Sequence, residues 1–204
     1  MQRGCAIGGL NTRCLNGFSL IEVLISIIVL SFGLLGMVGM QSAALQANRE
    51  ARLQSSASVL ARELAEMIRG NKDIGLLATG NPYAGSFDTS PLEAATPSYC
   101  LNVATSTTPC ADRAAIANAE MTEWLGRVNA QLPGARVSVC LDSAPYDGDG
   151  LPQWACNSAG ASGVIVVKIG WTRGSTNRSA SGDSALERAS APSIVFPITP
   201  GSST

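Results

Sequence analysis

The sequence contains no histidine, and this absence excludes several kinds of chemistry. Neither the Ser-His-Asp nor the Cys-His form of nucleophilic catalysis can be built without histidine. The most common side-chain ligand of metal ions is missing as well. Serine, aspartate and glutamate are present, but no spacing pairs them as a catalytic set. We therefore expect that the protein is not an enzyme and that it needs no cofactor or metal.

Charged residues are also scarce. They make up 14% of the 204 residues, and the formal net charge is -1. The chain therefore has neither the basic surface that attracts nucleic acid nor a strongly acidic surface, and nucleic acid is not expected as its main partner. A chain of this length holds one domain of ordinary size, or a small domain with an extension.

The scarcity of charge is greatest near the N-terminus. Residues 18–40 form an apolar run of about 23 residues, which is long enough to cross the hydrocarbon core of a lipid bilayer as a helix. Its only charge is Glu22, whereas residues 1–17 carry Arg3 and Arg13 and no acid. This distribution predicts one membrane span with a cytoplasmic N-terminus and an exported remainder. No clear small-residue cleavage site follows the run, so an ordinary secretory signal is disfavoured.

Six cysteines divide into two groups. Two precede the apolar run and four follow it: Cys5 and Cys14, then Cys100, Cys110, Cys140 and Cys156. The spacings within the second group differ from the C-x-x-C pairs of zinc and thioredoxin-type sites. Disulfides fit best, and they require an oxidising compartment. Local loop closure favours Cys100–Cys110 and Cys140–Cys156, although four cysteines allow three pairings and free buried thiols are the alternative.

Glycine and proline are absent from residues 41–69, so we expect the helix of the apolar run to continue through this stretch. Apolar side chains there recur at the helical repeat and form one stripe: Leu53, Ala57, Leu60, Leu64 and Met67/Ile68. The charged residues lie largely off that stripe, and Arg62 is spaced to pair with Glu66. Gly70 and Asn71 predict the end of the helix. The stripe offers one face on which a soluble domain packs.

The remaining residues predict a head that contains both helix and strand. Residues 71–110 are rich in glycine, proline, serine and threonine and are expected to be mostly loop. A second helix is predicted over residues 112–132, because Asp112 is a suitable N-cap and Pro133-Gly134 follows its end.

Strands are expected after this helix. β-branched runs between turn-rich segments predict an antiparallel sheet of strands at residues 135–141, 164–171 and 193–198, with a flexible loop over 174–184. The sheet needs an apolar surface to cover it, and the stripe on the long helix supplies one. The predicted fold class is therefore α+β, with a long N-terminal helix packed on an antiparallel sheet.

Two further features could bind a ligand. Asp142, Asp147 and Asp149 could offer oxygens to calcium, but their spacing does not meet the EF-hand pattern. Successive Asp-Gly pairs are typical of a turn, which is the favoured interpretation. The tryptophans could form a sugar-binding surface, although tryptophans dispersed in a small domain usually belong to its core: Trp124, Trp154 and Trp171.

The start of the apolar run resembles a processing signal. The segment "GFSLIEVLISIIVLSFGLLGM" is similar to the class III signal of type IV pilins and pseudopilins. That signal combines a short basic leader ending in glycine, an aromatic residue, and a hydrophobic helix with glutamate at the fifth mature position. Gly17, Phe18 and Glu22 match it in register.

Two later stretches resemble the PilV family of minor pilins, the type IV pilus modification proteins. "ARELAEMIRGN", residues 61–71, is similar to the end of that family's long helix. "EMTEWLGRVNAQLPGARVSVC", residues 120–140, is similar to its second helix, Pro-Gly turn and following strand. Glu120, Met121 and Ala135 depart from the family pattern.

The resemblance implies a processed and exported subunit with three parts: a leader at 1–17, a long helix at 18–70 whose first part, 18–40, is transmembrane, and a head at 71–204. Prepilin peptidase would cut between Gly17 and Phe18 and methylate the new N-terminus. The head would face the periplasm while the span sits in the inner membrane, and would reach the pilus or cell surface on assembly.

The partners implied are the lipid bilayer, the inner-membrane assembly platform, the major pilin and other minor pilins. The expected work is to start or modify a pilus for twitching, adhesion or DNA uptake. Alternatives are a pseudopilin of a type II secretion system, which shares the signal, and a membrane-anchored binding protein that never polymerises.

Glu22 is the candidate assembly residue. A lone carboxylate in a membrane span is costly and usually functional, and the resemblance implies that it faces the α-amino group of Phe18 in a neighbouring subunit. The alternative is an acid placed favourably at the N-terminal end of the helix dipole. The span also contains Gly33, Gly36 and Gly39, which either let the helix unwind in a filament or let a neighbouring helix approach closely.

Overall fold

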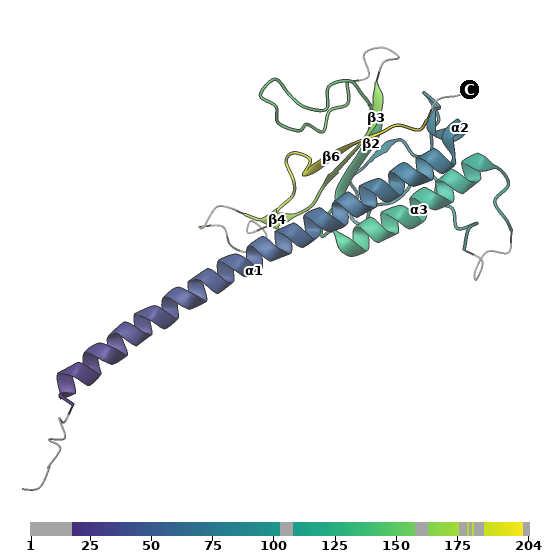
Figure 1. The fold of residues 1–204 in the computed structure, drawn as a ribbon. Helices are drawn as coiled ribbons and strands as arrows, with labels where there is room; N and C mark the ends of the chain where they lie inside the picture. Colours follow the sequence, from purple (N-terminus) through teal and green to yellow (C-terminus); the bar gives the residue numbers. More distant parts are fainter. Residues whose placement is uncertain are drawn as a thin grey trace, which may run out of the picture. The chain divides into compact units, whose positions relative to one another are not determined.

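The first element of the described residues is one long helix (Figure 1). The computed structural model describes residues 18–102, 108–157, 163–175, 179, 181 and 186–201. Helix α1 spans Leu20–Gly70 and carries Glu22 in its first turn and Arg69 in its last turn. The predicted continuation of the helix through residues 41–69 is therefore confirmed. The chain divides into two compact units, of which one ends at Asn48 and the other, the head unit, begins at Arg49.

The head unit adds short helices and strands to the second part of α1. In chain order they are α2 Lys72–Gly75, β1 Gly85–Phe87, α3 Arg113–Gln131, β2 Arg136–Asp142, β3 Val164–Gly170, β4 Arg173–Gly174, β5 Leu186–Glu187 and β6 Ile194–Ile198. The fold is thus α+β, as the sequence predicts.

Helix α3 begins and ends where its sequence signals lie. The Asp112 carboxylate accepts a hydrogen bond from the backbone N–H of Ala115 at 2.7 Å, which satisfies one of the free donors of the first turn. At the other end Leu132 is extended, and Gly134 has a φ of 54°, a conformation that glycine adopts without strain. A side chain at Gly134 would also collide with Thr172.

Four strands form one antiparallel sheet in the order β1-β2-β3-β6. Strands β2 and β3 pair along their whole length, from Arg136 opposite Gly170 to Asp142 opposite Val164. Pro197, which cannot donate a ladder hydrogen bond, lies in the edge strand β6. The short strands β4 and β5 pair separately.

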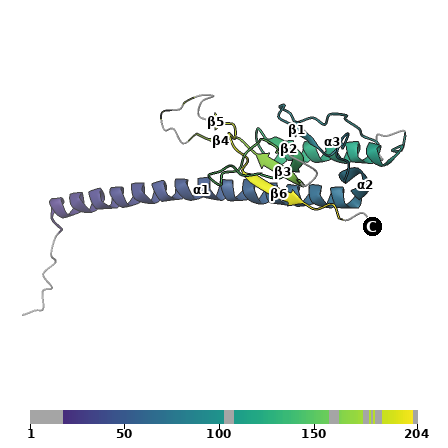
Figure 2. The ribbon, with the colours of Figure 1, turned by 90° about the horizontal axis from the view of Figure 1, so that it is seen from above.

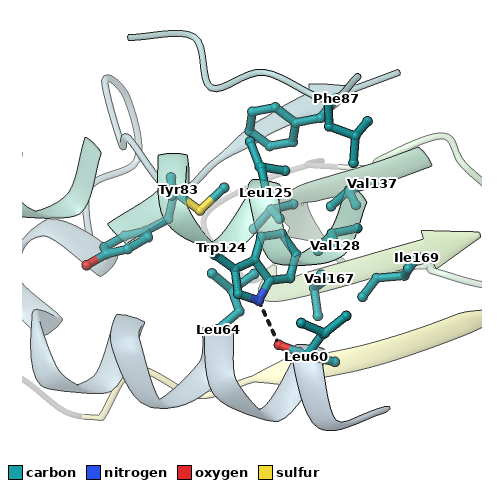
Figure 3. Packing of buried hydrophobic residues seen from close by; sticks show 14 of the residues in the cluster. Leu60, Leu64, Tyr83, Phe87, Trp124, Leu125, Val128, Val137, Val167 and Ile169 are labelled. Atoms are coloured by element: carbon teal, nitrogen blue, oxygen red, sulfur yellow. Dashed lines mark hydrogen bonds between the residues drawn. The ribbon is translucent and has the colours of Figure 1, made fainter. Parts of the chain in front are cut away.

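The core lies between the sheet and the two long helices (Figures 2 and 3). Side chains of α1, α3 and alternate positions of β2 and β3 join one buried cluster. Trp124 is completely buried at its centre and donates an indole hydrogen bond to the backbone carbonyl of Leu60 at 2.9 Å. The predicted stripe on α1 is confirmed: Ala57, Leu60, Leu64 and Ile68 are buried, and Leu53 and Met67 are partly buried. The buried face also includes Ala61 and Ala65.

Other local predictions were wrong or incomplete. The described part of 71–110 is mostly loop, as predicted, but the prediction did not include the short helix α2 and the short strand β1. Much of the predicted loop 174–184 lies outside the described residues, although β4 ends at Gly174 inside its start. Glu66 does not pair with Arg62; it forms its ion pair with Arg69, three residues later, at 2.5 Å.

We predict that shortening a core side chain of α1 destabilises the head. Leu64→Ala should lower the free energy of unfolding by about 2–5 kcal/mol, because Leu64 has no exposed surface and its loss leaves a cavity. Val59→Ala, on the exposed side of the same helix, should change it by less than about 0.5 kcal/mol. Denaturant unfolding of a protein consisting of residues 49–204 measures both, and equal effects would contradict the assigned packing.

Candidate functional site

The N-terminal end of α1 brings together two of the predicted site residues. Phe18 is exposed, and Glu22 lies in the first helical turn. The backbone N–H groups of Glu22 and Val23 donate to the carbonyl of Ser19 at 3.0 and 3.3 Å. The Ser19 carbonyl therefore accepts the first backbone hydrogen bonds of the helix. Gly17, the remaining one of the three predicted motif residues, lies outside the described residues, as do Cys5 and Cys14.

Glu22 lines a shallow groove of about 390 Å³ that runs along one side of the helix. The groove contains Phe18, Glu22, Ser26 and Leu30, each separated from the next by four residues. The Ser26 hydroxyl donates to the Glu22 backbone carbonyl at 2.7 Å, and therefore does not satisfy the carboxylate. Within the described residues, the Glu22 carboxylate has no hydrogen-bond or ion-pair partner, so a partner for this charge lies outside that part of the chain.

The same helix is long and apolar enough to cross a membrane. Its most apolar window of 18 residues has a mean hydropathy of 2.5, and none of that window is buried within the chain. Side chains added at Gly33, Gly36 or Gly39 would meet nothing within 4 Å. No contact among the described residues therefore requires glycine at the three positions, and both interpretations of them remain predictions about the assembled form.

A buried ion pair lies on the sheet face that is turned away from the two helices. Lys168 has no exposed surface and Asp142 has 2%. The Lys168 ammonium lies 2.5 Å from one Asp142 carboxylate oxygen and donates to the Ala155 carbonyl at 2.6 Å. The other carboxylate oxygen accepts from the backbone N–H groups of Ala144 and Asn157 at 2.9 and 3.0 Å.

These contacts decide the protonation of Asp142. Burial alone would raise its pKa, but the hydrogen bonds from Lys168, Ala144 and Asn157 together outweigh burial and hold the pKa below its usual value. The carboxylate is thus charged at neutral pH, and its ionic contact joins the end of β2 to β3. The segment after β2 is held to this pair by hydrogen bonds through Ala144, Ala155 and Asn157.

The segment 143–157 covers this second face of the sheet. The Cys140–Cys156 disulfide holds its end beside β2. The Trp154 ring packs against Gly170, where any side chain would collide with it, and the Arg136 guanidinium lies 4.4 Å from its centre. Both faces of the central strands are therefore covered, which explains why β3 is buried along almost its whole length.

The second disulfide joins Cys100 to Cys110, with the two Cα atoms 5.0 Å apart. The same part of the chain is attached to α3, because the Ser98 N–H donates to the Thr122 hydroxyl at 3.0 Å. Both disulfides, Cys100–Cys110 and Cys140–Cys156, join the pairs of cysteines that local loop closure favours. Two disulfides within one head fit an oxidising compartment.

The acidic loop does not assemble a calcium site. Asp142 is bound to Lys168, whereas Asp147 and Asp149 are exposed. One Asp147 carboxylate oxygen accepts from the backbone N–H groups of Asp149 and Leu151 at 3.0 and 2.8 Å, which is the geometry of an Asx turn. Asp142 also lies near the sulfurs of Cys140 and Cys156, but these are bonded to each other and do not offer metal ligands.

The tryptophans and a buried tyrosine serve the packing of the head. Trp124 and Trp171 have no exposed surface, and Trp154, in the covering segment, is partly buried against the sheet. Burial, and then the hydrogen bond that Tyr83 donates to Glu120, raise the pKa of Tyr83 well above its usual value. Tyr83 therefore stays neutral and acts as a structural donor.

A cluster at the start of the head unit was not predicted from the sequence. Glu50 on α1 accepts a hydrogen bond from the Trp171 indole at 3.4 Å and forms an ion pair with Arg173 at 2.9 Å. The Arg173 guanidinium also lies over the Trp171 ring, 5.1 Å from its centre. The two partners are more than a hundred residues away in sequence, so only the folded arrangement reveals the contact.

We predict a pH-dependent contribution of Asp142 to stability. Asp142→Asn should lower the free energy of unfolding by about 3–5 kcal/mol at pH 7, because it leaves the buried Lys168 charge without its partner. Because folding lowers the pKa of Asp142, the stability that this carboxylate contributes is fully present above the ordinary carboxyl pKa of about 4. It is lost as the pH falls through the lower pKa that Asp142 has in the folded protein.

Denaturant titrations at several pH values measure this contribution. The difference in the free energy of unfolding between the unmodified protein and Asp142→Asn should stay constant from pH 7 to about pH 5. It should become smaller below about pH 4. A difference that persists unchanged down to pH 2, or that is absent at pH 7, would show that the ion pair does not act as assigned.

Comparison with known proteins identifies one match. Residues 13–38 match the prokaryotic N-terminal methylation motif. No curated protein and no solved structure matches the chain. The motif supports a type IV pilin-like protein, either pilin or pseudopilin, that prepilin peptidase processes, and it points to a structural protein rather than an enzyme. Together with the membrane-capable helix it is consistent with anchoring in the inner membrane.

Proposed function

We propose that the chain is a minor pilin of the type IV pilus, similar to the PilV family, which joins the filament or helps to start it. The observation that carries this proposal is the Glu22 carboxylate in the first turn of an exposed apolar helix, within the matched motif and without a partner in the part of the chain that the structure describes. The α+β head with two disulfides is the kind of exported domain that such a helix would carry.

Processing would create the assembly residue at the N-terminus. Prepilin peptidase removes residues 1–17 by cutting between Gly17 and Phe18, and methylates the new α-amino group. The mature chain then has a helix at 18–70, of which 18–40 first spans the inner membrane, and a head at 71–204 in the periplasm. Cys5 and Cys14 leave with the leader, so the mature chain retains an even number of cysteines.

Glu22 would then set the axial position of the subunit. A carboxylate removed from water needs an opposite charge to recover its desolvation cost. The α-amino group of Phe18 in a neighbouring subunit provides that charge, and only one relative height of the two helices brings the groups together. The apolar side chains around Glu22 are exposed in the single chain and would be covered by neighbouring helices, the major pilin and other minor pilins among them.

The head would define what the subunit adds to the filament. It would reach the pilus or cell surface when the helix leaves the inner-membrane assembly platform, and would support twitching, adhesion or DNA uptake there. Its disulfides and the Asp142–Lys168 pair would keep it folded outside the cytoplasm.

Replacing the assembly carboxylate tests this function. Glu22→Ala should reduce the amount of the chain in sheared pili by about tenfold or more, because the neighbouring amine loses its partner in an apolar environment. Ser31→Ala is the matched control within the same span, since the Ser31 hydroxyl only donates to the backbone carbonyl of Ile27 and its loss should change little. Immunoblots of sheared and cell-bound fractions give the ratio.

Three results would count against the proposal. Normal incorporation of Glu22→Ala would exclude the role of the carboxylate in register. Absence of the unmodified chain from pili would favour a membrane-anchored binding protein. A chain that is dispensable for pili but required for secretion of exported proteins would be a type II pseudopilin instead.

A further inference from the structure

The exposed side of α1 within the head unit has an unusual order of residues. Side chains at alternating intervals of three and four lie along one line, opposite the buried stripe: Arg52, Ser55, Val59, Arg62, Glu66 and Arg69. We refer to these six residues as the outer seam. All six residues are exposed, and Val59, in the middle, has 59% of its surface exposed. Intervals of three and four are those by which helices pack side by side.

The charges of the seam are not balanced among the described residues. All three acids on this part of α1 already have cationic partners: Glu50 binds Arg173, Glu63 binds Arg127 and Glu66 binds Arg69. Within the described residues no ion pair or side-chain hydrogen bond joins Arg52 or Arg62 to another group. Two arginines, ten residues and about 15 Å apart along the helix, are therefore left without an opposite charge.

We propose that the outer seam binds an acidic helix of a neighbouring pilus subunit. This inference rests on the proposed function, and it adds the chemistry of the partner. The partner helix carries carboxylates at a similar spacing, facing Arg52 and Arg62, and an apolar side chain between them that covers Val59. Small Ser55 lets the two helices approach closely beside that contact.

The composition of the seam favours a protein partner over an anionic lipid or nucleic acid. Phosphate groups would use the arginines, but they would leave the exposed Val59 between them in contact with water. A helix with acids on either side of an apolar residue satisfies all three positions. Charge pairs at exposed sites select the partner and fix its register more than they add affinity.

Single charge reversals test the proposal in cells that make the full chain. Arg62→Glu should lower the fraction of the chain in sheared pili by about tenfold relative to the unmodified chain, because it places like charges in contact. Arg62→Lys, which keeps the charge, should retain most incorporation. Lys72→Glu is the matched control, since it makes the same change of charge at an exposed residue off the seam. Intact disulfides and unchanged protease resistance would show that each variant is folded.

Photo-crosslinking identifies the partner. A photoreactive amino acid in place of Val59 should link the chain to a helix of another pilin at a segment that carries carboxylates. A link to a second copy of this chain or to lipid, or no link at all, would overturn the proposal. Normal incorporation of Arg62→Glu would also overturn it while leaving the proposed function intact. If the unmodified chain itself is missing from pili, the proposed function fails first.

Discussion

The packing of one face of α1 against α3 and the sheet is the contact on which the head depends. Leu60 and Leu64 supply apolar surface to it, and the Trp124 indole donates to the Leu60 carbonyl from its centre. The helix that forms the core of the head is continuous with the apolar segment that begins at Leu20. One helix therefore supplies the packing face of the head and also carries the membrane-capable segment.

Two further constraints hold the opposite face of the sheet. The Cys140–Cys156 disulfide and the hydrogen bonds to the Asp142–Lys168 ion pair attach the segment 143–157 across β2 and β3. A buried ion pair is tolerated there because each charged group has additional hydrogen bonds, from Ala144 and Asn157 on one side and to Ala155 on the other. With this segment in place, both faces of the central strands are covered.

The sequence predicts the parts of this fold that depend on local order. Helical periodicity locates the buried face of α1, and the Asp112 cap locates the start of α3. Strand β1 has only three residues in a glycine-rich segment, which is too short to show the alternation of apolar and polar residues that predicts a strand. The partner of Glu66 was missed because two arginines lie within reach on the helix: Arg62, four residues before Glu66, and Arg69, three residues after it. The Asp142–Lys168 pair requires the register of β2 and β3, which only the folded sheet defines.

The site itself was located by a motif rather than by its geometry. Phe18 and Glu22 follow from the position of one acid in an apolar run, whereas the structure adds that this carboxylate has no partner among the described residues. The central claim is that the segment 13–38 is a processing signal as well as a span. Mass spectrometry of the purified mature protein tests it most directly. The account predicts a chain that starts at N-methylated Phe18, and an intact Met1 or a cut after residue 40 would contradict it.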